Sequence, residues 1–370
     1  MENKQTCLYD KHVALGALMS PFGGFEMPIQ YRGIVDEHQA VRTACGVFDV
    51  SHMGEVFIKG NDAERYVNHI FTNNVVGMPA GKILYGMMCY ENGGVVDDLL
   101  VYKMDDQCFF LVINASNIDK DWAWIKEQAK GYDVVLEHQS DLYGELAVQG
   151  PQAEMVMEEV LGIACKELTF YTFKAIEPPL PLERSGGKVF LVSRTGYTGE
   201  DGFEIYATPQ YINECWDKLM AAGVQPCGLG CRDTLRFEVG LPLYGDELSE
   251  DITPIMAGLG IFVKLDKEEF IGKEALAQQK AEGPRQKLVG IELADKAIPR
   301  HGYLVLTPEG EAIGEVTTGY HTISTDKSVC MALINSAYAK LDTPLAIQIR
   351  KKVFPGKVVK KQFYSKSYKK

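Results

Sequence analysis

The sequence predicts an α+β fold, because helical and strand-like segments alternate without the regular order of a doubly wound sheet. Apolar residues at three- and four-residue spacing mark helices in the N-terminal region, and short apolar runs separate them. The last part of the chain instead reads as short strands between glycine turns. A length of 370 residues suits two or three domains, and a hydrophobic content of 46% supports a buried core.

Three helices are expected in the N-terminal region. The first begins near Asn61, the second takes Ser116 as its cap, and the third opens at Thr208-Pro209 and stops at Gly223. The side chains expected on their buried faces are Ala63, Tyr66, Val67 and Ile70, then Ile118, Trp122 and Ile125, then Ile212, Trp216 and Leu219. Strands are expected at residues 99–102, 108–114 and 144–148.

A polar stretch over residues 278–286 contains Glu282-Gly283-Pro284 and predicts a linker. It would separate an N-terminal region, 1–277, from a C-terminal module, 287–370. That module is expected to be a small β-barrel. Its predicted strands are 287–293, 303–306, 314–318 and 346–349.

The segment from Ser193 to Glu204 is the most informative in the chain. A β-branched, apolar run from Val189 to Val192 leads into three glycines within seven residues, which force the backbone through tight turns. The alternating Phe203-Glu204-Ile205-Tyr206 then predicts another strand. Such a hairpin either places one carboxylate at the edge of a pocket or carries solvated acids on the surface.

Further motifs accompany this segment along the chain, at Pro21–Pro28, Val41-Arg42, Phe48–Gly54, Asn92–Leu99, Gly228–Asp233 and Leu243–Gly245. Together with Ser193–Glu204, and in this order, they resemble the aminomethyltransferase family of the glycine cleavage system, the T-proteins. Phe25 stands where that family often has Trp, and Cys231 where it usually has Ala. The resemblance covers the chain from end to end.

The resemblance implies a multidomain folate-binding T-protein fold, with two intertwined N-terminal subdomains and the C-terminal barrel around a central folate site. It also implies a reaction. The family transfers the methylene of an aminomethyl group, carried on the lipoyl arm of H-protein, to tetrahydrofolate as co-substrate. The products are 5,10-methylenetetrahydrofolate, ammonia and dihydrolipoyl H-protein.

Residue roles follow from the same motifs. Asp98 matches the family's catalytic aspartate, Glu204 its pterin-binding glutamate and Arg232 the arginine associated with the substrate tail. Asp97 is expected to be a turn acid that points to the opposite face. Residues expected to line the folate pocket are Tyr85, Tyr102, Asn114, Tyr197 and Met53, with Tyr364 as a C-terminal contributor.

Two other functions share this fold. A non-enzymatic folate-binding protein of the iron–sulfur assembly type would carry a K-G-C-Y-x-G-Q-E segment, which is replaced here by Arg194–Gly202. A folate-dependent demethylase of another substrate is harder to separate by sequence. No P-loop or complete G-x-G-x-x-G is present, and Gly228-Leu229-Gly230 is a weak nucleotide signal.

The composition excludes several classes of ligand and partner. The nine cysteines are scattered, and Cys227 and Cys231 lack a second ligand pair, so no metal is expected. The net charge of −12 argues against nucleic acid, although Lys and Arg crowd the chain from Arg350 onward and could help dock an acidic carrier protein. No apolar run reaches the roughly 18 residues of a membrane span, and the N-terminus shows no targeting pattern, so a cytoplasmic protein is expected.

Overall fold

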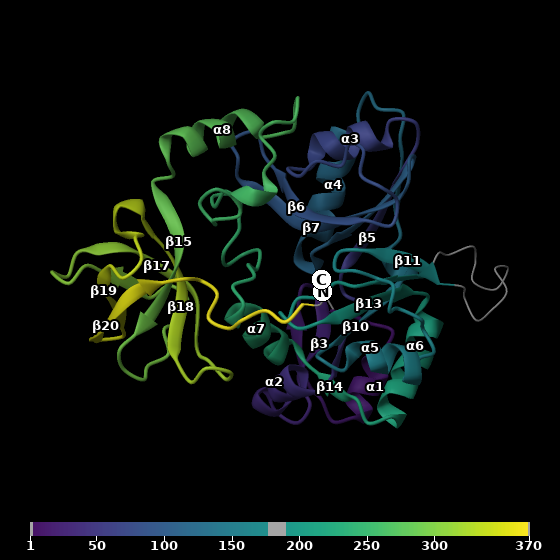
Figure 1. Cartoon of the computed structure of the whole chain (residues 1–370), viewed down its shortest axis with the longest axis horizontal. Helices are drawn as coiled ribbons and strands as arrows, with labels where there is room; N and C mark the ends of the chain where they lie inside the picture. The colour runs from purple at the N-terminus through teal and green to yellow at the C-terminus, as the bar shows by residue number, and fades with distance from the viewer. Residues whose placement is uncertain (1–2, 177–189, 369–370) are drawn as a thin grey trace.

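The computed structural model describes residues 3–176 and 190–368. Two sheets of the N-terminal region lie at the right of Figure 1, one above the other, and the C-terminal barrel lies at the left. Mixed helices and sheets confirm the α+β class. In the described residues, no helix is long and apolar enough to cross a membrane.

The first sheet is antiparallel and has the order β6-β7-β8-β5-β9. Its strands are β5 (Gly54–Lys59), β6 (Ile83–Cys89), β7 (Val95–Asp105), β8 (Cys108–Ile113) and β9 (Val135–His138). Helices α3 (Ala63–Ile70) and α4 (Ile118–Gln128) cover one face of it, where Tyr66 and Ile125 are fully buried. The opposite face is left for the second sheet.

The second sheet has the order β11-β12-β13-β10-β4-β14. Its strands are β4 (Gly46–Asp49), β10 (Gly144–Gln149), β11 (Phe173–Ile176), β12 (Phe190–Ser193), β13 (Gly202–Ala207) and β14 (Gln225–Cys227). Helices α1 (Tyr9–Ala14), α5 (Ala153–Met155) and α6 (Pro209–Ala221) lie beside it, and α6 packs Ile212, Trp216 and Leu219 into its outer core as predicted.

The chain passes repeatedly between these two sheets. It forms β4 in the second sheet, continues through β5 to β9 in the first, and returns with β10 to pair with β4. The two N-terminal subdomains are therefore intertwined, as the resemblance implied. Aromatic and aliphatic side chains from both sheets, among them Phe57, Phe110 and Tyr206, form one shared core between them.

Smaller elements complete the N-terminal region. Strands β1 (Lys4–Gln5), β2 (Leu18–Phe22) and β3 (Phe25–Gln30) make a third sheet, and α2 (Ile34–Thr43) packs against α7 (Leu229–Glu238). The short helical turns are η1 (Ala115–Asn117), η2 (Ser140–Leu142), η3 (Val156–Val160), η4 (Gly260–Phe262) and η5 (Ser336–Tyr338).

The C-terminal module is a closed six-stranded barrel, which confirms the predicted architecture. Its strands are β15 (Gln286–Leu293), β16 (Leu304–Leu306), β17 (Ala312–His321), β18 (Ser328–Asn335), β19 (Pro344–Ile349) and β20 (Lys352–Val359). The sequence predicted four of these. It missed β18, whose continuous apolar run lacks alternation, and gave no bounds for β20, whose lysines resembled a basic tail.

Two local predictions are wrong. The stretch predicted as a linker, 278–286, is helical in its first half, because α8 (Lys273–Glu282) continues until Gly283 ends it with a φ of 81°. Ser116 does not cap α4, since η1 precedes that helix and Asn117 occupies the N-cap position.

The end of the chain leaves the barrel and returns to the centre of the molecule, where both ends lie (Figure 1). Phe363 and Tyr364 donate their backbone N–H groups to the carbonyl of Glu238, at 2.8 and 2.7 Å. Ser367 donates to the carbonyl of Gly199 at 2.8 Å. The C-terminal segment thus joins the barrel to the glycine-rich hairpin.

Candidate active site

A cavity of about 580 Å³ lies between the two sheets. The first sheet contributes side chains from β6, β7 and β8, and the second contributes side chains from β10 and β13. Helix α7, residues 240–244 and the C-terminal segment complete its wall. This volume is in the range of sites that bury a drug-sized molecule.

Asp98 lies on the cavity wall made by the first sheet. The Tyr85 hydroxyl donates to its Oδ2 at 2.9 Å, and the Asn114 amide donates to its Oδ1 at 3.1 Å. Burial raises the pKa of Asp98 to about 7, and the neighbouring Asp97 carboxylate adds to the rise. A carboxyl group with a pKa near neutrality can change its protonation state during turnover.

Asp97 faces away from the cavity, as expected, but it is not a turn acid. It lies within β7 with no exposed surface and accepts three hydrogen bonds. The donors are the Asn114 N–H and Nδ2, both at 2.9 Å, and the Asn117 Nδ2 at 2.7 Å. Asn114 therefore bridges the two acids, and Asp97 fixes the amide that holds Asp98.

A second buried acid lies behind Asp97. Burial and the Asp97 charge raise the pKa of Asp121 to about 10, and Lys120 lies 3.0 Å from its Oδ1. Asp121 therefore stays protonated at neutral pH.

Glu204 lies on β13, on the wall made by the second sheet, and is 6% exposed. Its Oε2 accepts hydrogen bonds from the hydroxyls of Thr195 and, at 3.4 Å, Tyr206. Burial raises the pKa of Glu204, and the Arg232 charge opposes the rise. The carboxylate is fixed on one side and open to the cavity on the other.

The glycines of the hairpin are required by packing. A Cβ on Gly196 would lie 2.0 Å from Gln149 Oε1, and one on Gly202 would lie 2.4 Å from Gln149 Nε2. Gln149 crosses the hairpin, donates to the Thr195 carbonyl at 3.1 Å and accepts from Thr198 at 2.9 Å. The glycine pattern thus fixes the turn that presents Thr195 to Glu204.

Arg232 enters the cavity from the first turn of α7. Its guanidinium carbon lies 4.8 Å from the centroid of the Tyr197 ring, and within residues 3–176 and 190–368 no acid ion-pairs with it. Burial, together with Arg232, lowers the pKa of the neighbouring His52 to about 4, so that His52 is neutral. A stacked guanidinium in a pocket is a suitable partner for a carboxylate of a ligand.

Most of the predicted site residues meet in this cavity. Those that line it are Asp98, Glu204, Arg232, Tyr197, Asn114, Tyr85 and Met53. Tyr102 and Tyr364 do not line it. Tyr102 is buried behind the wall, with its hydroxyl 3.0 Å from that of Tyr206, and Tyr364 packs its ring 4.3 Å from the Arg42 guanidinium.

The C-terminal contribution to the cavity comes from residues that follow Tyr364 in the chain. Lys366 and Tyr368 line the cavity, and the Tyr368 ring stacks on Phe170 at 4.3 Å. The resemblance had placed this contribution at Tyr364. The segment is irregular, and its position is set by the hydrogen bond from Ser367 to Gly199.

Sequence reasoning also missed Glu145 and Tyr206, which line the cavity from adjacent strands of the second sheet. A signal was present for Glu145, because a charged residue interrupts the apolar run from Gly144 to Val148. Tyr206 was read only as part of the strand pattern.

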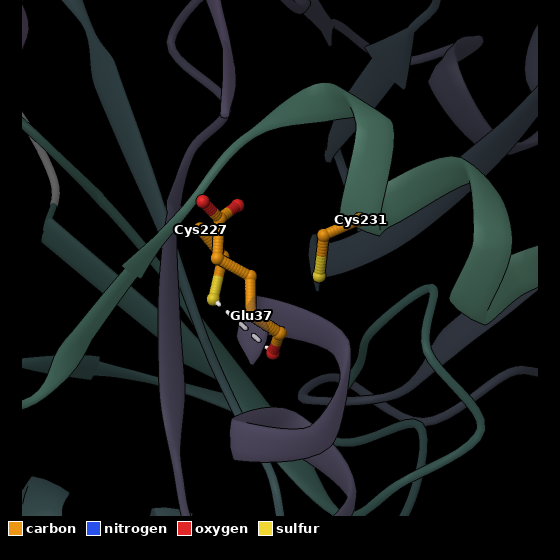
Figure 2. Close-up of side chains that lie close together, drawn as sticks. All are labelled: Glu37, Cys227 and Cys231. Atoms are coloured by element: carbon orange, nitrogen blue, oxygen red, sulfur yellow. Dashed lines mark hydrogen bonds between the residues drawn. The ribbon is translucent and has the colours of Figure 1, made fainter. Parts of the chain in front are cut away.

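Outside the cavity, Glu37, Cys227 and Cys231 place one potential ligand atom each within 4.8 Å of one another (Figure 2). The carboxylate of Glu37 is already engaged. Its Oε1 accepts from Tyr31 N–H at 2.6 Å and Arg32 N–H at 3.1 Å, and its Oε2 accepts from Gly228 N–H at 2.8 Å. Burial raises the pKa of the Cys227 thiol well above its usual range. These contacts indicate that Glu37 joins α2 to the start of α7, and they fit this structural role better than a metal site.

Comparison with known proteins identifies the family. The GCVT N-terminal domain matches residues 8–267, and the glycine cleavage T-protein C-terminal barrel domain matches residues 286–365. The chain belongs to the glycine cleavage T-protein family.

Similar proteins span the whole chain. The aminomethyltransferase of Alkaliphilus oremlandii is 48% identical over 373 residues, with full coverage of both chains. That of Lysinibacillus sphaericus is 48% identical over 370 residues, with 99% of each chain covered. The crystal structure of glycine cleavage system aminomethyltransferase T from Bartonella henselae has a TM-score of 0.92, 31% identity and 99% coverage of both chains. These similarities make the chain an aminomethyltransferase, a one-carbon transferase that uses tetrahydrofolate, and do not support the two alternative functions.

Proposed function

We propose that the cavity is the site where the methylene of an aminomethylated lipoyl arm reaches tetrahydrofolate, with Asp98 at the reacting atoms. The observation that carries this proposal is the placement of Asp98, Glu204 and Arg232 on three sides of one cavity. Ammonia and 5,10-methylenetetrahydrofolate leave, and the arm returns as dihydrolipoyl H-protein.

The chemical features of folate match these three groups. The pterin ring presents adjacent N–H donors, which the Glu204 carboxylate can accept as a pair. The glutamate tail is anionic, and Arg232 offers a guanidinium without an ion-pair partner in the described residues. Tyr85 and Asn114 hold Asp98 on the opposite wall, facing the space between them.

Asp98 acts at the step that releases ammonia. Loss of ammonia from the adduct leaves a methylene carbon that is still bonded to the lipoyl sulfur and bears positive charge. An ionised Asp98 would stabilise that charge before the first folate nitrogen attacks the carbon. Attack by the second folate nitrogen then breaks the carbon–sulfur bond, and the released thiolate takes up a proton to give the dihydrolipoyl arm. The same carboxylate could instead manage a proton on the folate nitrogens. The largely apolar walls of the cavity would limit the access of water to this carbon.

The partner is the lipoylated H-protein. The sequence predicted that the basic end of the chain helps to dock it. Its last two lysines, Lys369 and Lys370, lie outside the described residues, and the other cations have different surroundings. Arg350 and Lys351 form the exposed turn between β19 and β20, at the edge of the barrel in Figure 1. Lys361 donates to the Ala257 carbonyl, and Lys357 pairs with Asp342 at 2.8 Å. A docking role for the basic end therefore rests on Lys360 and Lys366, which are exposed near the returning segment.

Ammonia release from aminomethylated H-protein, measured with and without tetrahydrofolate, tests this function. We expect release to be fast and to depend on tetrahydrofolate, with stoichiometric formation of 5,10-methylenetetrahydrofolate. Methylated amines serve as the control substrate. Turnover of these amines, with no ammonia from the H-protein adduct, would favour a demethylase instead.

A further inference from the structure

Glu145 is a buried acid that the predicted catalytic and binding roles do not use. It lies in the middle of the second sheet, on β10, and is 2% exposed. Its Oε2 has no hydrogen-bond partner in the residues that the structure describes. A buried carboxyl oxygen without a hydrogen bond carries a desolvation penalty, so the position of this oxygen calls for a partner.

The backbone of Glu145 is fixed on both sides. Its N–H donates to the Ser51 hydroxyl at 2.9 Å, and its carbonyl accepts from the Ser51 hydroxyl at 3.2 Å and from Val50 N–H at 3.0 Å. It pairs with Tyr206 across the β10–β13 ladder, while Glu204 pairs with Ala147. Glu145 and Glu204 are therefore diagonal neighbours on the same face of the sheet, and both line the cavity.

The pterin ring of tetrahydrofolate has edges of two kinds. The exocyclic amino group and N3–H form an edge of two donors, which suits a carboxylate. The edges N3–H/O4 and N1/N8–H each combine a donor with an acceptor. A neutral carboxylic acid also offers one donor and one acceptor, so it matches an edge of the second kind.

We propose that Glu145 is a second pterin-binding residue, whose neutral carboxyl group hydrogen-bonds a donor–acceptor edge of the ring while Glu204 holds the donor–donor edge. The inference rests on the cavity being the folate site. Glu145 and Glu204 would thus bind two different edges of the ring, with one acid neutral and the other ionised.

The surroundings of Glu145 support the neutral state. Burial raises the pKa of Glu145 well above its usual range, and the carboxylates of Glu204 on β13 and Glu55 on β5 raise it further. Arg232 on α7 and the Tyr206 hydroxyl on β13 oppose this rise only in part. If Glu145 keeps its proton beside Glu204, the pair offers a ligand both a hydrogen-bond donor and hydrogen-bond acceptors.

The test is equilibrium titration of anaerobic tetrahydrofolate into the full chain and four variants. Glu145→Gln keeps a donor and an acceptor, so we expect its Kd to stay within about threefold of wild type. Glu145→Leu loses both, and we expect its Kd to rise about tenfold or more, the scale of one to two hydrogen bonds. Glu204→Gln points a donor at donors and should bind weakly.

Glu55→Gln is the matched control. Glu55 is also a fully buried acid whose oxygens have no hydrogen-bond partner among the described residues, but it does not line the cavity. Its Kd should stay within about threefold of that of wild type, because burial and Glu204 remain the larger causes of the raised pKa of Glu145. Thermal unfolding without ligand checks that each variant is folded.

The outcomes separate this inference from the function. Wild-type affinity in Glu145→Leu, with weak binding in Glu204→Gln, would overturn the role of Glu145 and leave the folate site intact. Wild-type affinity in both would overturn the folate site and the inference together. Equal losses in Glu145→Gln and Glu145→Leu would also contradict a neutral donor–acceptor contact.

Discussion

The two walls of the cavity hold their acids in different ways. On the first sheet, Asp98 is held by hydrogen bonds from Tyr85 and Asn114, and Asp97 fixes Asn114 from behind. On the second sheet, Glu204 has hydroxyl donors on one oxygen only, and Glu145 has an oxygen with no partner in the described residues. The acid on the first wall therefore has protein hydrogen-bond donors on both of its oxygens. The acids on the second wall keep an oxygen that a ligand can bind. We infer that the first wall carries the chemistry and the second carries the binding.

Replacing Asp98 should have the largest effect. Asp98→Asn removes the charge that would stabilise the cationic methylene carbon, and we expect turnover to fall by about 10²-fold or more. Ammonia release from aminomethylated H-protein measures it. Tetrahydrofolate should still bind within a few-fold of wild type, because shape and some hydrogen bonding remain. Near-normal turnover would remove Asp98 from the mechanism.

Replacing Glu204 should affect binding instead. Glu204→Gln turns a charged acceptor into an amide with a donor facing the pterin donors, and we expect a loss of about 2–3 kcal/mol in tetrahydrofolate binding. Direct titration gives this value. Unchanged affinity would mean that Glu204 serves only the hairpin that contains Thr195.

Asp97→Asn should destabilise the fold. The substitution sets an amide against the amides of Asn114 and Asn117, and we expect the free energy of unfolding to fall by about 1–3 kcal/mol. Denaturant unfolding measures the loss. An unchanged free energy of unfolding would show that the bridge through Asn114 is dispensable. Asn117→Ala should then leave the free energy of unfolding unchanged as well.

The pH dependence distinguishes the state of Asp98. Its pKa in the fold is raised to about 7 from an ordinary 3.8, so the ionised form dominates only above pH 7. If the carboxylate is the active form, turnover should rise about tenfold per unit below pH 7 and level off above it. The folded state holds this proton more tightly than the unfolded state, so stability falls as pH rises from about 4 to 7. Asp98→Asn should lack both effects, and a rate that falls with rising pH would indicate an acid role instead.

The smallest effect is expected at Tyr364. Its ring packs on Arg42 away from the cavity, so Tyr364→Phe should leave the KM for tetrahydrofolate unchanged. Tyr368→Phe is the comparison, since Tyr368 lines the cavity and should raise that KM a few-fold if its hydroxyl contacts folate. The opposite ranking would restore the role that the sequence gave to Tyr364.

Local motifs predicted much of this structure. The glycine hairpin, α3 and α6 followed from spacing, because each element satisfies its own turns and periodic face. The barrel was recognised from four of its strands. Resemblance placed Asp98, Glu204 and Arg232, and the cavity brings them together.

The wrong or missing predictions concern residues whose position depends on tertiary contacts. Tyr102 and Tyr206 lie on strands of different sheets, and only the packing between the sheets determines which of them reaches the cavity. The position of Tyr368 depends on a hydrogen bond to a hairpin far away in sequence. Glu145 was overlooked because an acid inside a strand usually faces solvent, and only the fold shows that this one is buried.

A kinetic comparison of Asp98→Asn and Glu204→Gln over a range of tetrahydrofolate concentrations tests the division between the two walls most directly. The rate of ammonia release from aminomethylated H-protein is followed in both variants. We expect the Asp98→Asn defect to persist at saturating tetrahydrofolate, as a loss in kcat, and the Glu204→Gln defect to be largely rescued, as a rise in KM. Rescue of Asp98→Asn by excess tetrahydrofolate, with a persistent kcat loss in Glu204→Gln, would contradict the assignment of chemistry to the first wall and binding to the second.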